Sequence, residues 1–551
     1  MTKGTLSGWG GQVTVDRTFV KLLTPPIRLA VPRSEKLLLI AAVFVAGMCS
    51  IVYELLISTT SSYFLGDSVK QFSLTIGVYM CAMGVGSFLT RYVRGHELEA
   101  FVQAEITLGL LGGLSVPLLY FLFQYQTNGQ YQWTMLALVF GIGCLTGVEI
   151  PLLARVMKTY YPLRDNLANV LGFDYLGALG ATLLFPFLLL PFVGLYSSSL
   201  LSGAVNLLLG LVVCWFFRKK LAPARRRRIY GLTALGMGLF AFLLIKAEPF
   251  LHAWEASAYP HRVIYEEDSP YQRIVLTQNR DDLRLYLNRV IQFSSRDEYR
   301  YHESLAQLPA AQVPSFERAL ILGGGEGLLA RELLRHESLA SLTIVDLDER
   351  IFDLGRRHPR IRALNGGALD DSRTTTVTED AAVFLRNDTT HYDLILADLP
   401  DPSSESIARL YSSWFFQKVR ARLTPHGVFA TQATSPYHTR KTFWSIYHTL
   451  AAAGFGELVA YHVPVPSFGE WGFVLAANAG NMLHAHGMAL TGTPPYLTTL
   501  RFLTPELLPT LFTFPQDMQD PGGLAVNRLD RPVLLDYFLD EWSDWQREKT
   551  Q

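Results

Sequence analysis

Cysteine is scarce in this 551-residue chain, and its placement excludes a disulfide framework. The four cysteines, Cys49, Cys81, Cys144 and Cys214, lie far apart within apolar stretches, and none belongs to a CxxC pair. Zinc sites and disulfide-rich folds need closely spaced cysteines. We therefore expect the thiols to act as small packing residues in apolar helices. The second half of the chain has no cysteine at all.

Charge is also missing from two long stretches. No charged residue occurs between Ile106 and Val148 or between Tyr175 and Phe217, whereas the second half is as charged as an ordinary soluble enzyme. The formal net charge is zero, which argues against a nucleic-acid partner because phosphate contacts need a basic surface. The sequence predicts a membrane part fused to a soluble part.

A membrane span needs about 20 apolar residues, and seven segments approach or exceed that length. These are 37–58, 71–90, 106–124, 132–154, 169–193, 197–217 and 230–246. Because the pattern repeats seven times, a cleavable signal peptide is a poor explanation of the first segment. We expect an N-terminal cytoplasmic segment over 1–35 and a transmembrane helical domain of about seven spans over 36–247, in contact with a lipid bilayer.

Basic residues cluster before the first segment and after the second, fourth and sixth. They are Lys21, Arg28, Arg33, Lys36, Arg91, Arg94, Arg155, Lys158, Arg164, Arg218, Lys219, Lys220 and Arg225–Arg228. Cytoplasmic loops carry the excess of Lys and Arg, so the N-terminus is expected in the cytoplasm. Seven spans would then place the soluble half outside, unless the shortest segment, 230–246, is re-entrant or interfacial.

Four acids lie within or at the ends of the apolar segments: Glu54, Glu105, Glu149 and Asp174. A carboxylate inside a membrane is costly and is a functional candidate for that reason. The preferred interpretation places these acids near the interfaces, paired with Arg155, with Arg164 or with a backbone group. A path for a cationic substrate is the alternative.

The soluble half begins with strand-like segments. Arg273–Thr277 (RIVLT) and Leu283–Leu287 (LRLYL) predict strands of a small β-rich subdomain over 255–315. From 316 to 480, alternation of strands and helices predicts a Rossmann-like α/β domain with a mostly parallel sheet. Its elements are expected at Arg318–Leu322, Leu328–His336, Leu342–Asp346, 374–378, 392–398, 427–432, 457–462 and 471–477. A tail follows over 481–551.

The stretch Ile321–Glu332 reads ILGGGEGLLARE, a hydrophobic run that enters a glycine cluster and then a helix. Glycines allow a tight turn there, and the helix start offers free N–H groups. Asp346 follows about 20 residues after the glycines, where a carboxylate accepts hydrogen bonds from ribose hydroxyls. An adenosine-type ligand is therefore favoured over a purely structural turn.

The spacing GGGEG differs from the G-x-G-x-x-G pattern of dinucleotide sites, which disfavours a dinucleotide. Asp380, in Thr378–Ala381 (TEDA), follows the third strand, where it could face an adenine amine. These features favour an adenosyl-sulfonium ligand in a methyltransferase-type sheet.

Two further acids follow the fourth strand in Leu394–Pro402, LILADLPDP. Asp398 and Asp401 lie at the carboxyl end of that strand, the edge where open α/β sheets bind their ligands. Two acids there suit a cationic amine substrate better than a neutral methyl acceptor. Solvated turn aspartates are the simpler alternative.

These motifs together resemble those of the polyamine aminopropyltransferase (spermidine synthase) family. The stretch ILGGGEGLLARELLRH resembles the family's glycine motif, and Arg296–Glu303 (RDEYRYHE) resembles a specific signature that precedes it. DLPDP resembles the catalytic D-x-x-D-P loop, Ser269–Gln272 (SPYQ) the first substrate motif, and Val465–Phe473 (VPSFGEWGF) the late strand. The apolar half and the C-terminal tail resemble the bacterial subgroup with a fused N-terminal transmembrane domain.

The resemblance implies transfer of an aminopropyl group from decarboxylated S-adenosylmethionine, as co-substrate, to putrescine, giving spermidine and 5′-methylthioadenosine. It implies no tightly bound cofactor and no metal. Asp398 matches the catalytic base, and Asp401 matches its substrate-binding partner. Positions matching the donor site are Gln272, Gly323, Gly325, Glu326, Asp346, Asp380 and Ala381. Positions matching the acceptor site are Gln292, Tyr301, His302 and Tyr461.

The sequence departs from the family pattern at several points. Glu326 replaces an aspartate, and Asn288-Arg289 replaces Asp-Gly, which adds a positive charge near the amine site. The residues 403–405 differ from the usual loop that covers the adenine. His484 and His486 lie in an expected loop and are interpreted as solvated.

Two alternatives stay open. A methyltransferase would need a basic group for the donor carboxylate, and the motifs show none. A polyamine carrier or sensor with a coupled soluble domain would make the intramembrane acids essential. We expect a multi-pass protein of the bacterial inner membrane with the catalytic domain in the cytoplasm, because the family's donor is made there. A homo-oligomer is expected by analogy.

Overall fold

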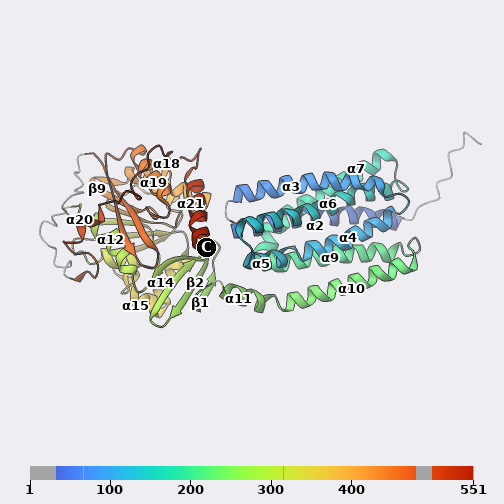
Figure 1. Cartoon of the computed structure of the whole chain (residues 1–551), viewed down its shortest axis with the longest axis horizontal. Coiled ribbons are helices and arrows are strands. Elements are labelled where there is room, and N and C mark those ends of the chain that lie inside the picture. Colours follow the sequence, from blue (N-terminus) through green and yellow to red (C-terminus); the bar gives the residue numbers. More distant parts are fainter. Residues whose placement is uncertain (1–32, 66–67, 258, 314, 480–498, 550–551) are drawn as a thin grey trace, which may run out of the picture. The chain divides into compact units, whose positions relative to one another are not determined.

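The computed structural model describes residues 33–65, 68–257, 259–313, 315–479 and 499–549 (Figure 1). The chain forms two compact units, Met1–Glu248 and Pro249–Gln551, called here the helical unit and the soluble unit. Lys21, Arg28, His484 and His486 lie outside the described residues. The finer division of the soluble unit at residues 315 and 480 stays a prediction.

All seven apolar segments are helical. The helices are α2 (Arg33–Leu65), α3 (Ser68–Leu89), α4 (Glu97–Gly113), α5 (Ser115–Tyr125), α6 (Asn128–Met157), α7 (Leu163–Leu184), α9 (Gly194–Phe216) and α10 (Pro223–Ile245). Helix α7 continues through a π-helical turn (Phe185–Leu189) into α8 (Leu190–Phe192). Within the described ranges, six helices are long and apolar enough to cross a membrane, and α4 with α5 forms a seventh candidate bent by 41°.

The path of the chain through the helical unit follows from the direction of α3 and α6. Gln132 near the start of α6 donates to Gln71 near the start of α3, at 3.3 Å, and Arg155 near the end of α6 donates to Thr90 just after α3, at 2.7 Å. The two helices are therefore parallel (Figure 1). The chain between them must return along the unit, so α4 and α5 together make one complete pass.

The helical unit thus makes seven passes. Segment 230–246 lies within α10, an uninterrupted helix of 23 residues that is long and apolar enough to cross a membrane, and the re-entrant or interfacial alternative stays a prediction. The length of α10 was underestimated because the basic stretch Arg225–Arg228, which looks like a loop, forms its first turns. The bend lies instead between α4 and α5, beside Leu114.

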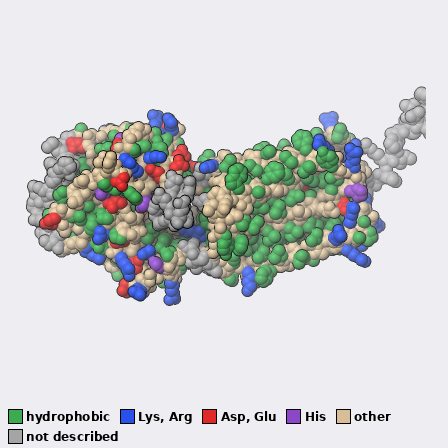
Figure 2. All heavy atoms as spheres, in the orientation of Figure 1, with side chains coloured by type: hydrophobic (Ala, Val, Ile, Leu, Met, Phe, Trp, Pro, Cys, Tyr) green, Lys and Arg blue, Asp and Glu red, His purple; other side chains and the backbone are tan. Residues whose placement is uncertain are grey.

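The outer surface of the helical unit is apolar. Figure 2 shows hydrophobic side chains over its visible face, with basic side chains gathered at one end. Phe192 is 80% exposed and Trp133 is 75% exposed, which would be unfavourable in water but matches a hydrocarbon surrounding.

Glu105 and Glu149 differ from the expected interfacial pairs, whereas the expectation for Glu54 and Asp174 stays a prediction. Arg155 donates to the carbonyl oxygens of Thr90 and Val93, at 2.7 and 3.1 Å, and caps the end of α3. Glu105 and Glu149 are fully or almost fully buried among the helices. Sequence position alone could not show which faces of α4 and α6 point inward.

The soluble unit starts with a four-stranded antiparallel sheet in the order β1-β2-β3-β4. The strands are β1 (Arg262–Asp268), β2 (Arg273–Asn279), β3 (Asp282–Leu287) and β4 (Val290–Ser294). The two predicted strands, RIVLT and LRLYL, are confirmed within β2 and β3.

A seven-stranded sheet follows, in the order β10-β11-β9-β8-β5-β6-β7. Its strands are β5 (Arg318–Gly323), β6 (Ser341–Asp346), β7 (Thr374–Thr378), β8 (Tyr392–Asp398), β9 (Leu423–Gln432), β10 (Glu457–Val465) and β11 (Gly469–Ala477). Only β11 is antiparallel to the other strands of this sheet. The predicted Rossmann-like sheet is confirmed. Val465–Phe473, expected as a late strand, spans the end of β10, the hairpin turn and the first five residues of β11.

Helices cover both faces of this sheet. Alternate residues of β5 point to opposite faces: Ala319 and Ile321 join one hydrophobic cluster, and Leu320 and Leu322 join the other. The helices are α12 (Glu298–Ala310), α13 (Leu328–Leu333), α14 (Glu349–Arg357), α15 (Pro359–Leu364), α16 (Ala381–Asn387), α17 (Glu405–Ala408), α18 (Ser413–Ala421), α19 (Arg440–Ala452), α20 (Leu508–Leu511) and α21 (Leu534–Lys549).

The glycine turn after β5 is required by a close backbone approach. Gly323 has φ of +88° and pairs with Asp398 of β8 in the parallel register. A Cβ at this position would lie 2.0 Å from the carbonyl oxygen of Asp398. Only glycine allows β5 to end beside β8 in this conformation.

Gly323→Ala is expected to destabilise the soluble unit by several kcal/mol, because both the backbone conformation and the space exclude a side chain. Gly366→Ala is the matched control, since Gly366 also has a positive φ, +64°, but meets no atom within 4 Å. The control should cost about 1 kcal/mol. Thermal unfolding of the two purified variants measures the difference, and equal losses would contradict the steric explanation.

Candidate active site

A cavity of about 440 Å³ opens at the carboxyl ends of β5, β6 and β8. Most of the residues expected from the sequence line it: Gln272, Gln292, Tyr301, His302, Gly323, Glu326, Asp346, Asp380, Ala381, Asp398 and Asp401. They come from seven separate segments of the chain, which the fold brings to one edge of the sheet.

Two expected residues, Gly325 and Tyr461, do not line the cavity. Tyr461 is fully buried in β10, where its hydroxyl donates to the carbonyl oxygen of Ser304, at 3.1 Å. The N–H group of Gly325 donates to Oδ2 of Asp346, at 3.1 Å. Both residues support the wall of the cavity from behind.

Acidic side chains dominate the lining. Six acids face the cavity, Glu326, Asp346, Asp348, Asp380, Asp398 and Asp401, against His302 and Arg409 as its basic groups. Burial raises the pKa of Asp346 to about 6 and that of Asp401 to about 7. Burial and the charge of Asp398 raise the pKa of Glu326 to about 7. The cavity therefore favours a cationic ligand.

Asp398 is held at the end of β8 by one specific hydrogen bond. The hydroxyl of Tyr301 donates to its Oδ1 at 2.7 Å. Burial raises the pKa of Asp398, and the charge of His302 and the bond from Tyr301 oppose this without cancelling it. A carboxylate oriented in this way, with a raised pKa, is suited to accepting a proton.

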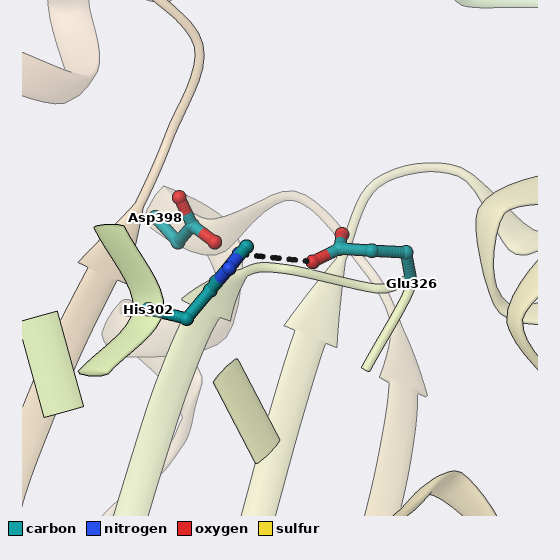
Figure 3. A group of neighbouring side chains, drawn as sticks. All are labelled: His302, Glu326 and Asp398. Atoms are coloured by element: carbon teal, nitrogen blue, oxygen red, sulfur yellow. Dashed lines mark ion pairs between the residues drawn. The ribbon is translucent and has the colours of Figure 1, made fainter. Parts of the chain in front are cut away.

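His302 joins the cavity to a buried chain of charges. Its Nε2 lies 3.8 Å from Oε1 of Glu326 (Figure 3), and its Nδ1 lies 2.8 Å from Oε2 of Glu298. Glu298 also accepts two hydrogen bonds from Arg331, each of 2.9 Å. Burial alone would raise the pKa of Glu298, but His302 and Arg331 lower it to about 2.

The same chain determines the charge of His302. Burial lowers its pKa, but the bond to Glu298 and the charges of Glu298, Asp398 and Glu326 outweigh burial, and the net pKa is raised. One ligand atom from each of His302, Glu326 and Asp398 lies within 4.8 Å of the others, which is a spacing that could hold a metal ion. The imidazole lies 3.8 Å from Glu326, so in its protonated form it pairs with that acid.

A buried network fixes the loop that carries Asp401. Nε2 of Gln432, on β9, donates to the carbonyl oxygen of Leu399 at 2.6 Å and to the hydroxyl of Tyr411 at 2.5 Å. The Tyr411 hydroxyl donates to the carbonyl oxygen of Pro400 at 3.0 Å. Gln432 and Tyr411 were not predicted, since both lie outside every motif and meet the loop only through the fold.

Asp348 is a second residue that the sequence analysis missed. Its Oδ2 accepts hydrogen bonds from Ser269, at 2.6 Å, and from Gln272, at 3.0 Å. This carboxylate therefore ties the SPYQ loop of the small sheet to the end of β6. The sequence signal that could have identified Asp348 is its position two residues after Asp346, just beyond the carboxyl end of the same strand.

Asp380 has two partners in this structure. Its Oδ1 caps α16 by accepting from the N–H groups of Ala382 and Val383, at 3.0 and 3.1 Å, and its Oδ2 pairs with Arg409. The expected adenine contact would therefore compete with Arg409, a cavity residue that was not predicted. The segment carrying Arg409 follows the divergent residues 403–405.

Aromatic side chains from the β10–β11 turn complete the wall. Phe468 and Trp471 line the cavity with their rings 5.2 Å apart. Arg289, expected near the amine site, is instead placed with its guanidinium 4.3 Å above the ring of Trp254. The extra positive charge therefore does not enter the cavity lining.

The glycine turn, the acid at the end of β6 and the acid-lined cavity together define a Rossmann-like transferase suited to a cationic substrate. A family model described as the spermine/spermidine synthase domain matches residues 298–485. The chain is 40% identical over 513 residues to polyamine aminopropyltransferase 2 of Ralstonia nicotianae, covering 92% of this chain and 98% of the relative.

The polyamine aminopropyltransferase of Leptospira interrogans is 37% identical over 508 residues, covering 91% of this chain and 98% of the relative. The chain therefore belongs to the polyamine aminopropyltransferase family, and the match extends through the helical unit. A crystal structure of spermidine synthase with the transition state analogue AdoDATO is 25% identical, with a TM-score of 0.42, and covers 46% of this chain and 86% of that one.

Asp401→Asn is expected to stabilise the unliganded protein at high pH. A carboxyl whose pKa is raised to about 7 on folding binds its proton more tightly than the unfolded chain does. Wild-type stability is therefore lost as pH rises from about 4 to about 7. The variant should melt at least ~2–4 °C above wild type at pH 8, and the gap should narrow towards pH 5.

Asp371→Asn is the matched control, because Arg373 lowers the pKa of Asp371. This variant should gain no stability at pH 8. Melting curves over the pH range check both expectations, and a pH-independent gap for Asp401→Asn would contradict the buried-charge explanation.

Proposed function

We propose that the soluble unit transfers an aminopropyl group from decarboxylated S-adenosylmethionine to putrescine, giving spermidine and 5′-methylthioadenosine. The observation that carries this proposal is the pair Asp398 and Asp401 inside an acid-lined cavity beside the glycine turn. Family membership supports the aminopropyl transfer, and the charge of the cavity supports cationic substrates on both sides of the reaction.

The donor fits the side of the cavity next to the glycine turn. Each oxygen of Asp346 accepts one backbone N–H group, from Gly325 and Asp348, and retains a lone pair for a ribose hydroxyl. Glu326, next to His302, is available for the donor's amine. Intact S-adenosylmethionine would need a cation for its carboxylate, but Arg409, the guanidinium in the lining, pairs with Asp380. This arrangement disfavours the methyltransferase alternative.

Asp398 supplies the base for the chemical step. A protonated alkylamine, with a reference pKa of about 10, has no lone pair with which to attack carbon. Asp398 accepts the amine proton through the oxygen that Tyr301 does not occupy. The freed nitrogen lone pair forms a bond to the methylene next to sulfur, and the C–S bond electrons pass to sulfur. The neutral thioether product leaves.

The acceptor fits between the two aspartates and the aromatic turn. Asp401 pairs with the far ammonium group of the diamine, and one of its oxygens has no hydrogen-bond partner among the described residues. Phe468 and Trp471 supply an apolar wall for the methylene chain. Alignment of the two substrates in line supplies much of the acceleration, since the sulfonium is already activated.

Asp398→Asn should lower aminopropyl transfer by about 10²–10⁴-fold with donor binding retained, because it removes the base without changing the shape. The assay incubates the detergent-purified full chain with decarboxylated S-adenosylmethionine and diaminopropane, putrescine, cadaverine or spermidine. Mass spectrometry detects methylthioadenosine and the new polyamine. Asp281→Asn, an exposed turn acid, is the control. Full activity of Asp398→Asn would refute the base assignment.

The helical unit is proposed to span the cytoplasmic membrane of a bacterium. Its length, its apolar surface and its seven passes support this, and the basic end is then the cytoplasmic end. An odd number of passes carries the chain after Ile245 to the opposite face. The catalytic unit was expected in the cytoplasm because the family's donor is made there. The seven passes of the helical unit instead support a catalytic unit outside the cytoplasm.

Cysteine labelling checks this arrangement, because the soluble unit has no native cysteine. In spheroplasts treated with a membrane-impermeant maleimide, Asp281→Cys in the soluble unit should be labelled directly. His96→Cys, at the basic end, should be labelled only after permeabilisation. The reverse pattern would place the catalytic unit in the cytoplasm.

A further inference from the structure

The helical unit contains a buried polar cluster that the proposed reaction does not use. Glu105 of α4 and Asn206 of α9 have no exposed surface, and Glu149 of α6 is 2% exposed. Both carboxylate oxygens of Glu105, one of Glu149 and both amide atoms of Asn206 lack a hydrogen-bond partner among the described residues. Groups of this kind are normally satisfied when buried.

These side chains converge on one place. Helices α4 and α9 pack closely, so that a Cβ on Gly210 would lie 3.5 Å from the Cβ of Glu105, and one on Gly109 would lie 3.2 Å from the Cβ of Asn206. Glu105 and Asn206 thus lie one turn apart across this interface. Glu149 is close enough to Glu105 for their charges to interact.

Other residues of the bundle complete the surroundings. Cys49 of α2 lies within electrostatic range of both glutamates. The ring of Tyr53 packs against Gly112, where a Cβ would lie 2.5 Å from it, and its hydroxyl also lacks a partner among the described residues. Asp174 of α7 lies near Glu149. Five helices therefore contribute to one polar site.

No basic residue of the bundle can neutralise these acids. In the seven passes, Lys and Arg occur only in the first or last two turns of a helix, whereas Glu105 is eight residues inside α4, about 12 Å along the helix axis. Two neighbouring buried carboxylates remain charged only if a cation enters between them.

We propose that this cluster is a second binding site, for a protonated primary amine. An ammonium group has three N–H donors, and the two glutamates with the amide oxygen of Asn206 offer three acceptors. The ring of Tyr53 and the apolar helix walls suit an alkyl chain. The choice of an amine rests on the proposed function of the soluble unit, and the site itself rests on the geometry of the bundle.

The experiment uses the full-length Asp398→Asn/Asp401→Asn double variant in detergent, so that the catalytic cavity no longer retains the ligand. Equilibrium dialysis with radiolabelled putrescine is expected to show one saturable site per chain. Adding Glu105→Gln or Glu149→Gln should weaken that site at least tenfold. Glu97→Gln, near the start of the same helix as Glu105, is the matched control and should leave binding unchanged.

A second measurement separates a binding role from a structural one. Glu105→Gln in the otherwise wild-type chain should keep aminopropyl transfer. In the absence of amine, its melting temperature should be no lower than that of wild type. Putrescine should no longer raise that melting temperature through the second site. The proposal would be overturned if the double variant showed no saturable putrescine site, or if sodium ions at millimolar concentration displaced putrescine from that site. If the wild-type chain binds putrescine at the second site but catalyses no aminopropyl transfer, only the proposed function is overturned.

Discussion

Buried acidic groups that outnumber their positive partners are the constraint on which both units depend. In the soluble unit, Glu326 and Asp401 face the cavity with pKa values raised to about 7. In the helical unit, Glu105 and Glu149 are buried and form no ion pair with any lysine or arginine that the structure describes. Such arrangements weaken the empty protein, and a cation that enters removes the cost. Ligand affinity and instability of the empty state therefore have the same physical origin.

The side chains expected to react are held in place by hydrogen bonds from other residues of the soluble unit. Arg331 and Glu298 orient His302, while Gln432 and Tyr411 hold the backbone around Asp401. Glu298, Gln432 and Tyr411 are buried, and their hydrogen bonds join protein groups, so the geometry does not depend on a ligand. The cavity acids have fewer partners, which leaves them available for substrate.

The parts of the fold visible in the sequence are those with local signals. The hydrophobic run in 318–322 and the glycines after it predicted β5 and its turn because both signals depend on neighbouring residues. Asp348, Tyr411 and Gln432 were missed because their partners lie 11 to 79 residues away. The basic stretch Arg225–Arg228 hid the first turns of α10, which it forms, since charge usually indicates a loop rather than a helix.

The register of β5 and β8 has an evolutionary consequence. Because Gly323 lies directly beside Asp398, a change in one strand displaces both the donor side and the base. New acceptor lengths are therefore unlikely to arise there. The β10–β11 turn, which supplies Phe468 and Trp471, is joined to the rest of the sheet only through β11. Variation in that hairpin can reshape the acceptor end while the reacting atoms keep their alignment.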